Sequence, residues 1–311
     1  MDCFLLGSGG MMPMPERRLS ALLVRYQGCM ILFDAGEGVQ IGLKALNLGL
    51  RGLDVVAITH LHADHVLGLP GVMMLRTQMP DPAPLTLIGP PGLQDFVQDL
   101  HRSVRFFLNY PLHFVELDEG ADPVAWRDED LVLRWTPLEH STFCLGYRLD
   151  EQPRPGRFDL ARAQALGVPR GPLFSQLQRG LPVTLDDGTW VQPEQVLGPA
   201  RRGRSVVYAV DTRPCQTLRT LCQQADLAVL DGMFTPDEVE HARDKRHMTM
   251  SEAAELAQQA GVRHTLLTHL SPRHRADEVA TLERSLRERF ANVRIGRDGD
   301  SVELAPLDDP A

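Results

Sequence analysis

The sequence predicts an α/β fold built on mixed β-sheets. Short runs rich in Val, Leu and Ile alternate with segments of helical period, and strands interleaved with helices are typical of α/β domains. The early strands follow one another with only turns between them, so we expect hairpins and a mixed sheet, not a purely parallel one. At 311 residues, of which 43% are hydrophobic, the chain can bury a sizeable core.

Each expected strand is a short apolar run, and each expected helix has apolar residues at helical spacing. The strands, in chain order, are Cys3–Leu6, Leu22–Tyr26, Met30–Phe33, Val55–Thr59, Leu85–Ile88, Leu131–Trp135, Ser205–Val210, Leu227–Leu230 and Thr265–Thr268. The helices include Gly92–Val104, Ser251–Ala260 and Asp277–Phe290.

Residues 150–204 differ in composition from the rest of the chain. They contain seven prolines, many glycines and the hairpin turn signal Asp186–Gly188. This composition indicates an insertion, and we assign an inserted arm to residues 150–182. Its local charge is positive, because five arginines outnumber three acidic residues. The arginines are Arg154, Arg157, Arg162, Arg170 and Arg179, and the acids are Asp150, Glu151 and Asp159.

Charge and hydropathy exclude some classes of protein. The net charge of −9, from 32 basic and 41 acidic side chains, repels polyanions at long range and by itself argues against a nucleic-acid partner. The apolar stretches are broken by polar residues and too short to span a membrane.

The N-terminus lacks the features of a secretory leader, so we expect a cytoplasmic protein. The five scattered cysteines contain no CxxC pair and are expected to be reduced.

A cluster of ligand-type side chains follows the strand expected to end at Thr59. His60, His62, Asp64 and His65 lie within six residues, and we expect them to converge without a helix to space them. Neutral imidazole nitrogen and carboxylate oxygen are ligands that Zn²⁺ prefers. A solvated polar loop is the alternative, but the apolar segments on either side make it unfavourable. The motif therefore predicts a metal site.

This HxHxDH motif resembles the signature of the metallo-β-lactamase superfamily. The resemblance covers nearly the whole chain and implies one domain over residues 1–311, folded as a four-layer αββα sandwich of two mixed sheets. It also implies two Zn²⁺ ions per subunit, with Mn²⁺ as a possible substitute, and further ligands at the ends of later strands. The implied ligand sets, with Asp211 bridging them, are His60, His62 and His140 for one ion and Asp64, His65 and His269 for the other.

Such a pair of metal ions would favour hydrolysis. Two ions about 3.5–4 Å apart can activate water and stabilise a departing oxyanion, and this chemistry suits a phosphodiester. Asp64 could bind a metal through one carboxylate oxygen and use the other to orient or deprotonate the water.

The inserted segment contains the run Gly167-Val168-Pro169-Arg170-Gly171-Pro172. With this run the chain resembles ribonuclease Z, the family of tRNA 3′-processing endonucleases. In that family an insertion at this place is a flexible arm that grips the tRNA elbow, usually across a homodimer. The resemblance therefore implies a homodimer and a tRNA precursor as partner. No membrane is expected from the hydropathy, and no other protein partner is inferred. The arm positions that match the family are Arg157, Gly167, Pro169, Gly171 and Pro172.

His247 lies just before an expected helix. Thr249 and Glu252 have the spacing of a capping box, so we expect the helix to start at about Met250. The helix dipole would lower the pKa of His247, and a proton donor there needs a carboxylate to counter this effect. In ribonuclease Z the matching histidine is the proposed proton donor, supported by the glutamate of a His-Glu-Ala-Thr segment. The aligned stretch here is Leu230-Asp231-Gly232-Met233, which implies Asp231 as the carboxylate and places a leucine where the family has histidine.

Two further segments resemble substrate contacts of the family. Gly7-Ser8-Gly9-Gly10 lacks the third glycine of a dinucleotide-binding loop and resembles the family's opening loop, which continues to a Pro…Arg-Asn segment that contacts the tRNA 3′ end. Pro13 and Arg17 match this segment, and Arg18 replaces the asparagine. The family's phosphate-binding Ser-x-Arg is matched by Ser271 and Arg273.

We therefore predict a zinc-dependent endoribonuclease that removes the 3′ trailer of precursor tRNA on the 3′ side of the discriminator and leaves a 3′ hydroxyl. Two alternatives stay open. The departure at residues 230–233 favours a dinuclear metal phosphodiesterase that acts on small phosphodiesters or cyclic nucleotides. A non-catalytic tRNA-binding relative would follow if this departure had silenced the site, although every implied metal ligand is present.

Overall fold

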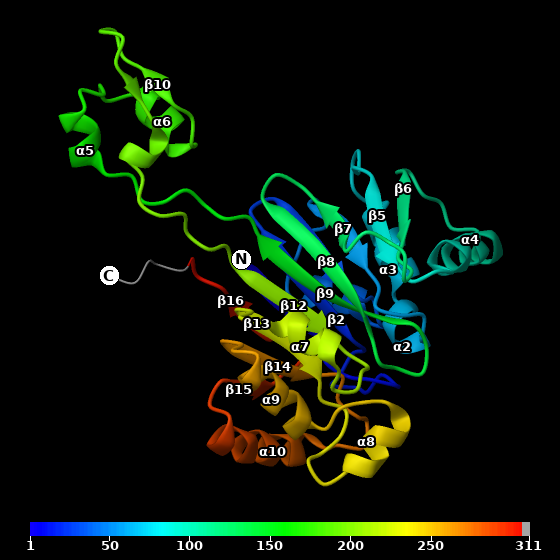
Figure 1. Cartoon of the computed structure of the whole chain (residues 1–311). Coiled ribbons are helices and arrows are strands. Elements are labelled where there is room, and N and C mark those ends of the chain that lie inside the picture. Colours follow the sequence, from blue (N-terminus) through cyan, green and yellow to red (C-terminus); the bar gives the residue numbers. More distant parts are fainter. Residues whose placement is uncertain (307–311) are drawn as a thin grey trace. The chain divides into compact units, whose positions relative to one another are not determined.

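The computed structural model describes residues 1–306, which fall into two compact units (Figure 1). The larger unit contains Met1–Asp150 and Ser205–Ala305, and the smaller one contains Glu151–Arg204. Among the described residues, no helix combines the length and apolar character that crossing a membrane requires.

The larger unit contains two seven-stranded sheets. The first has the order β16-β1-β2-β3-β4-β5-β6, with strands β1 (Asp2–Gly7), β2 (Ala21–Tyr26), β3 (Cys29–Phe33), β4 (Leu53–Ala57), β5 (Leu85–Gly89), β6 (Leu112–Glu116) and β16 (Ser301–Glu303). The second has the order β15-β14-β13-β12-β9-β8-β7, with strands β7 (Val124–Arg127), β8 (Leu131–Leu138), β9 (Cys144–Glu151), β12 (Ser205–Ala209), β13 (Leu227–Asp231), β14 (His264–Thr268) and β15 (Val293–Ile295).

Both sheets are mixed. In the first, β16 to β3 pair antiparallel and β3 to β6 pair parallel. In the second, β12 to β15 pair parallel, whereas β9 is antiparallel to β12 and β7 is antiparallel to β8. The carboxyl ends of the parallel strands in each sheet therefore reach a common edge, where polar side chains can gather.

Strand alternation explains how the sheets stack. Leu22 and Val24 of β2 belong to a core between the two sheets, and Leu23 between them belongs to a core on the outer face, because successive side chains of a strand point to opposite faces. The same outer core contains residues of helices α1 (Val39–Ala45), α3 (Leu69–Arg76) and α4 (Leu93–Val104).

The outer face of the second sheet is covered in the same way. Helices α7 (Gln216–Cys222), α9 (Met250–Gln259) and α10 (Ala276–Arg289) share a third core with β12, β13 and β14. The layers are therefore helices, sheet, sheet and helices, as Figure 1 shows for this unit. This is the αββα sandwich that the sequence predicts.

The predicted strands and helices are all present, with ends that shift by one or two residues in most cases. In the larger unit, strands β6, β7, β9, β15 and β16 were not predicted. Four of them lie at a sheet edge, whereas β9 lies inside the second sheet, between β12 and β8, and Gly146, Arg148 and Asp150 interrupt its apolar run. An edge strand buries less surface, so its apolar signal is weak. One prediction about the metal motif is wrong: Asp64 and His65 lie in a one-turn helix, α2 (Ala63–Val66).

The smaller unit has a core of its own. It contains α5 (Leu160–Ala165), α6 (Pro172–Gln178), the hairpin strands β10 (Val183–Thr184) and β11 (Trp190–Val191) and a 3₁₀ turn at Pro193–Gln195. Buried residues from these elements and their connections form one cluster: Ala163, Val168, Leu177, Val183, Val191 and Val196. The hairpin turn predicted at Asp186–Gly188 is confirmed, with Gly188 at φ 84°. The unit extends to Arg204, beyond residue 182, where the predicted arm ends.

Candidate metal centre

The site lies where strands of both sheets end. His60 and His62 follow β4, His140 follows β8, Asp211 follows β12 and His269 follows β14. Because β12, β13 and β14 are parallel, their carboxyl ends lie side by side. Asp34 comes directly after β3, which is parallel to β4. Residues far apart in the sequence therefore meet at one edge of the sandwich.

One group of possible ligands contains His60, His62, His140 and Asp211, whose ligand atoms lie within 4.8 Å of one another. His62 Nδ1 lies 2.9 Å from His60 Nε2 and 3.4 Å from His140 Nε2. Asp211 Oδ2 is 3.6 Å from His60 Nε2 and 3.7 Å from His140 Nε2. These distances describe a compact group of three imidazoles and one carboxylate oxygen.

A second group contains Asp64, His65 and His269. His269 Nε2 lies 3.3 Å from both His65 Nε2 and Asp64 Oδ2. The other oxygen of Asp211, Oδ1, is 3.5 Å from His65 Nε2 and 3.1 Å from His269 Nε2. The Asp211 carboxylate therefore faces one group with each oxygen.

These residues fit a pair of divalent cations. A neutral imidazole carries one N–H, so ring nitrogens that face one another at about 3 Å cannot all be satisfied by hydrogen bonds. Asp211 Oδ1 is also buried without a hydrogen-bond partner among the described residues. A cation in each group would bind these lone pairs, and nitrogen with carboxylate oxygen is a donor set suited to Zn²⁺.

Further contacts fix the orientation of the histidine rings. The buried carboxylate of Asp34 lies 2.8 Å from His65 Nδ1 and accepts hydrogen bonds from Thr59 N, Thr59 Oγ1 and the Tyr208 hydroxyl. The Arg246 carbonyl lies 3.2 Å from His140 Nδ1. Such partners hold the outer nitrogen, so that the inner nitrogen can face a metal. The sequence analysis missed Asp34, although Asp34, like Asp211, closely follows an apolar strand.

Local backbone strain helps to bring the site together. Asp34, Asp211 and His269 adopt left-handed conformations, with φ of 54°, 54° and 59°. Asp and His accept this conformation more readily than bulky apolar residues, and such strain persists when the surroundings hold it in place. A Cβ atom at Gly10 would lie 2.4 Å from His269 Nε2, so the glycine allows the opening loop to approach this ring.

The carboxylates of the site raise the pKa values of two of its histidines. Burial lowers the pKa of His65, but Asp211 and Asp34 outweigh burial and hold it well above its usual range. Burial likewise opposes a proton on His269, yet Asp211, Asp231 and Asp64 raise its pKa to about 10. A metal ion must displace such protons, so metal affinity is expected to fall as the pH falls.

His247 and Asp231 form a pair beside the two ligand groups. His247 Nδ1 lies 2.7 Å from Asp231 Oδ2, and the His247 ring stacks on His269 with 5.5 Å between centroids. Helix α9 begins at Met250 behind the predicted capping box, which is confirmed. Burial lowers the pKa of His247, but Asp231 raises it more, and the net pKa is above the ordinary value. The carboxylate therefore counters both burial and the helix dipole.

The metal centre opens into a cavity of about 460 Å³. Met11, Phe234, His241 and Lys245 line it, and the sequence analysis did not identify these four. Five of the predicted ligand residues also line it: His62, Asp64, His140, Asp211 and His269. Lys245 ends helix α8 (Val239–Lys245), and Met11 donates its backbone N–H to Asp64 Oδ2 at 2.6 Å. Met11 and Phe234 lie outside helices and strands, and His241 and Lys245 lie in the short helix α8, so no motif or spacing predicts their place at the cavity.

The residues predicted to contact substrate lie in different environments. Arg273 lines this cavity, over the Phe234 ring and 3.1 Å from Glu238, and it donates to the buried Ser271. Arg17 instead donates to the backbone carbonyls of Ser271 and His274, so its guanidinium braces the chain. The remaining predicted contacts are exposed: Pro13 in the opening loop, and Arg157, Gly167, Pro169, Gly171 and Pro172 in the smaller unit.

Known proteins resemble this chain over nearly its whole length. It is 40% identical over 305 residues to ribonuclease Z of Treponema pallidum (strain Nichols), covering 98% of each chain. It is 41% identical over 300 residues to ribonuclease Z of Methanosarcina acetivorans, covering 96% of each. The chain belongs to the ribonuclease Z family.

Solved structures and family descriptions agree with the fold of a ribonuclease Z. The crystal structure of human tRNase Z, short form, has a TM-score of 0.71 and 22% identity, covering 98% of this chain and 100% of the human one. The family described as "Anti-Pycsar protein Apyc1" matches residues 1–105, and "Beta-lactamase superfamily domain" matches residues 181–270. The predicted metallo-β-lactamase fold and family are therefore confirmed.

The contact between Asp34 and His65 gives a testable prediction. Asp34→Asn keeps the size of the side chain and tolerates the left-handed backbone, but it removes the charge that holds the His65 ring. Metal affinity should fall by about 10–100-fold, as measured by competition with a chromophoric chelator. Tyr208→Phe removes another partner of the same carboxylate and should have a smaller effect. Unchanged metal affinity in Asp34→Asn would show that this contact does not orient the ligand.

Proposed function

We propose that this ribonuclease Z family member is a metal-dependent endoribonuclease that removes the 3′ trailer of precursor tRNA. It would hydrolyse the phosphodiester on the 3′ side of the discriminator and leave a 3′ hydroxyl. The observation that carries the proposal is the pair of ligand groups around Asp211, in a chain similar over its whole length to proteins named ribonuclease Z. We propose two Zn²⁺ ions as the cofactor because of the donor set, with Mn²⁺ as a possible substitute.

The chain's own residues have distinct parts in this reaction. Metal ions in the two groups would supply an activated water and positive charge for the phosphate oxygens. His60, His62, His140, Asp64, His65, His269 and Asp211 are the residues that would hold them. Asp64 can orient the attacking water or accept its proton, because its carboxylate lies at the edge of the cavity.

We assign to His247 the protonation of the leaving oxygen. Its Nδ1 faces Asp231, so its Nε2 is the nitrogen available to give a proton to the departing 3′ oxygen. The pKa of Asp231 is lowered to about 2, because His247 and His269 outweigh the effect of its burial, and it stays ionised as the partner of the histidine. Asp231 thus supplies the carboxylate that a protonated His247 needs, even though Leu230 stands where the family has a histidine.

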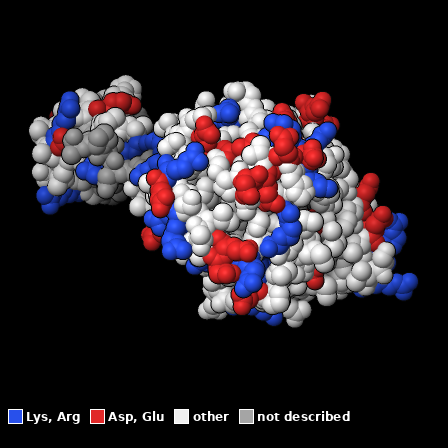
Figure 2. Space-filling view, turned by 90° about the horizontal axis from the view of Figure 1, so that it is seen from below, with Lys and Arg blue, Asp and Glu red and all other residues white. Residues whose placement is uncertain are grey.

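The smaller unit is proposed as the tRNA-binding arm of an otherwise single metallo-β-lactamase domain. Arg157 and Pro169 are exposed there, and the turn between α5 and α6 contains Gly167 and Gly171 at positive φ. Over Glu151–Arg204 eight arginines outnumber five acidic residues. On the face of the molecule seen in Figure 2, basic and acidic side chains are interspersed, so local groups of charge must guide the RNA.

We also propose a homodimer. Ile41, Leu67 and Met74 are exposed by 59%, 50% and 46%, and they lie in α1, directly after α2 and in α3. Exposed apolar side chains on neighbouring helices are typical of a surface covered by another protein chain. The cytoplasmic location expected from the sequence stays a prediction.

A direct test uses precursor tRNA labelled at its 5′ end. Protein stripped with a chelator should be inactive, and reloading with Zn²⁺ or Mn²⁺ should give one cut after the discriminator, with metal content measured on the same sample. His247→Gln should lower kcat by about 10²–10⁴-fold, with the metal content retained. An uncut precursor at every metal, with wild type and variant alike, would overturn the proposal in favour of a non-catalytic RNA-binding protein.

The pH dependence of cleavage tests the His247–Asp231 pair. A general acid must be protonated, so kcat/KM should decline as the pH rises through the pKa of His247. Asp231→Asn removes the carboxylate that raises this pKa, and the decline should begin at a lower pH. Hydrolysis of bis(p-nitrophenyl) phosphate is the control, because its leaving group needs no proton. An unchanged alkaline limb for tRNA in Asp231→Asn would contradict the assignment of His247.

The structure defines where the proposed arm can be removed. The backbones of Arg154 and Arg201 pair antiparallel, with N–O distances of 2.9 and 2.8 Å, so a short Gly-Ser turn can replace residues 155–200. Cleavage of precursor tRNA should collapse, while hydrolysis of bis(p-nitrophenyl) phosphate should persist. Equal retention of both activities would contradict the role of the smaller unit in binding tRNA. Hydrolysis of the small ester with no cleavage of precursor tRNA by the complete chain would favour the alternative, a hydrolase of small phosphodiesters or cyclic nucleotides, to which the leucine at position 230 also points.

A further inference from the structure

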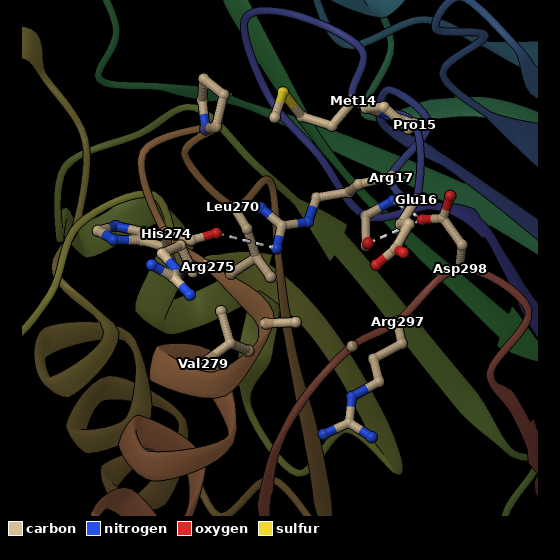
Figure 3. A pocket seen from close by; sticks show the side chains of 14 residues that line it. Met14, Pro15, Glu16, Arg17, Leu270, His274, Arg275, Val279, Arg297 and Asp298 are labelled. Carbon is tan, nitrogen blue, oxygen red and sulfur yellow. Dashed lines mark hydrogen bonds between the residues drawn. The ribbon is translucent and has the colours of Figure 1, made fainter.

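A second cavity lies in the larger unit, outside the metal centre. It has a volume of about 620 Å³ and contains none of the ligand residues (Figure 3). Met14 and Arg17 of the opening loop line it, together with Leu270, Arg275, Val279 of α10, and Arg297. The metal-centre cavity and this one are adjacent, because Met11 and Arg273 line the former and Met14 and His274 line the latter.

Two chain segments form the ridge between the cavities. The opening loop and the segment after β14 are joined by backbone hydrogen bonds from Gly10 N to Leu270 O and from Leu270 N to Ser8 O. Arg17 reinforces the ridge with hydrogen bonds to the carbonyls of Ser271 and His274, the second of which Figure 3 shows. An extended chain that leaves the metal centre over this ridge would enter the second cavity.

The lining of the second cavity combines apolar surface with arginines. Leu270 and Val279 lie between the side chains of Arg17, Arg275 and Arg297 in Figure 3. Apolar surface suits the face of a nucleobase, and a guanidinium can donate two hydrogen bonds to a phosphate. The cavity therefore offers partners for both parts of a nucleotide in single-stranded RNA.

The charges around this cavity leave the outer arginines able to bind an anion. Arg275 pairs with Asp277 at 3.3 Å and Arg297 pairs with Glu283 at 3.6 Å, with both guanidinium side chains more than half exposed. Such exposed ion pairs contribute little and exchange readily. Two acidic residues are also in the lining, Asp298 and the exposed Glu16. Asp298 accepts from Ser8 N, Ser8 Oγ and Arg18 N, so its charge is already satisfied by the protein.

The placement of His247 gives the strand a direction. If His247 protonates the departing 3′ oxygen, the nucleotide that carries this oxygen lies on the side of His247, with Phe234 and Lys245. The trailer keeps the scissile phosphate at its 5′ end. It then lies on the opposite side of the metal-centre cavity, where Met11 is. We propose that the second cavity binds a nucleotide of the 3′ trailer, with Arg275 and Arg297 on its phosphates. This inference rests on the proposed function.

The test compares precursor tRNAs whose trailers have one or six nucleotides. Arg275→Ala/Arg297→Ala should lower kcat/KM for the long trailer by about fivefold per arginine and leave the short trailer unchanged. The slope of log kcat/KM against log salt concentration should become less negative by about 0.7 for each arginine removed. This change is expected for the long-trailer substrate alone. Met14→Glu places a negative charge at the same cavity. It should also lower kcat/KM for the long-trailer substrate and leave the short-trailer substrate unchanged.

The control is Arg102→Ala/Arg284→Ala, two exposed arginines outside the lining, which should leave both substrates unchanged. Equal effects of Arg275→Ala/Arg297→Ala on short and long trailers, or no effect on either, would overturn the proposal. Binding of a fluorescent single-stranded hexanucleotide with a 5′ phosphate separates this failure from failure of the proposed function. If no precursor is cut, weaker binding of the hexanucleotide by Arg275→Ala/Arg297→Ala than by the wild type still supports the second cavity as a nucleotide-binding site. Equal binding by the two proteins overturns it.

Discussion

The buried carboxylate of Asp211 is the interaction on which the site depends. One of its oxygens faces His60 and His140, and the other faces His65 and His269. Both ligand groups therefore share one charged side chain, at the end of β12 in the middle of the second sheet. The arrangement requires the ends of strands from two sheets to meet at one edge. The αββα sandwich supplies this, because its parallel strands end together.

The protein holds these charges in place with contacts outside the ligand groups. Asp34 orients His65, and Asp231 links His247 to the neighbourhood of His269. Asp34, Asp211 and His269 have strained backbone, and Gly10 lies against the His269 ring. Isolated segments would not adopt these conformations, so the surrounding core holds them in place. A metal ion entering such a site meets ligands that are already oriented, and the chain does not need to reorganise them.

The net charge of −9 is less adverse to an RNA partner than it first suggests. Asp64, Asp211 and Asp231 face histidines or would face metal ions, and Asp298 is enclosed by backbone and hydroxyl donors. These carboxylates contribute little to the field at the surface. Recognition of RNA then depends on local groups of arginines in the smaller unit and around the second cavity. It also depends on how far these arginines lie from exposed acidic residues.

The sequence by itself determined the family, because the HxHxDH motif after an apolar strand keeps its chemistry and spacing in any context. The αββα fold and the predicted residues of the two ligand groups followed from that resemblance. The sequence also placed the capping box ahead of α9 and the turn at Asp186–Gly188. The edge strands, the inner strand β9 and the helix that contains Asp64 were missed. Edge strands carry a weak apolar signal, polar residues and a glycine interrupt β9, and a single helical turn has no period. Only the tertiary structure decided that Asp34 reaches His65, that Arg17 braces a ridge and does not face the metal centre, and that Met14, Arg275 and Arg297 share a cavity. These contacts join residues that are distant in the chain, and no local pattern records them.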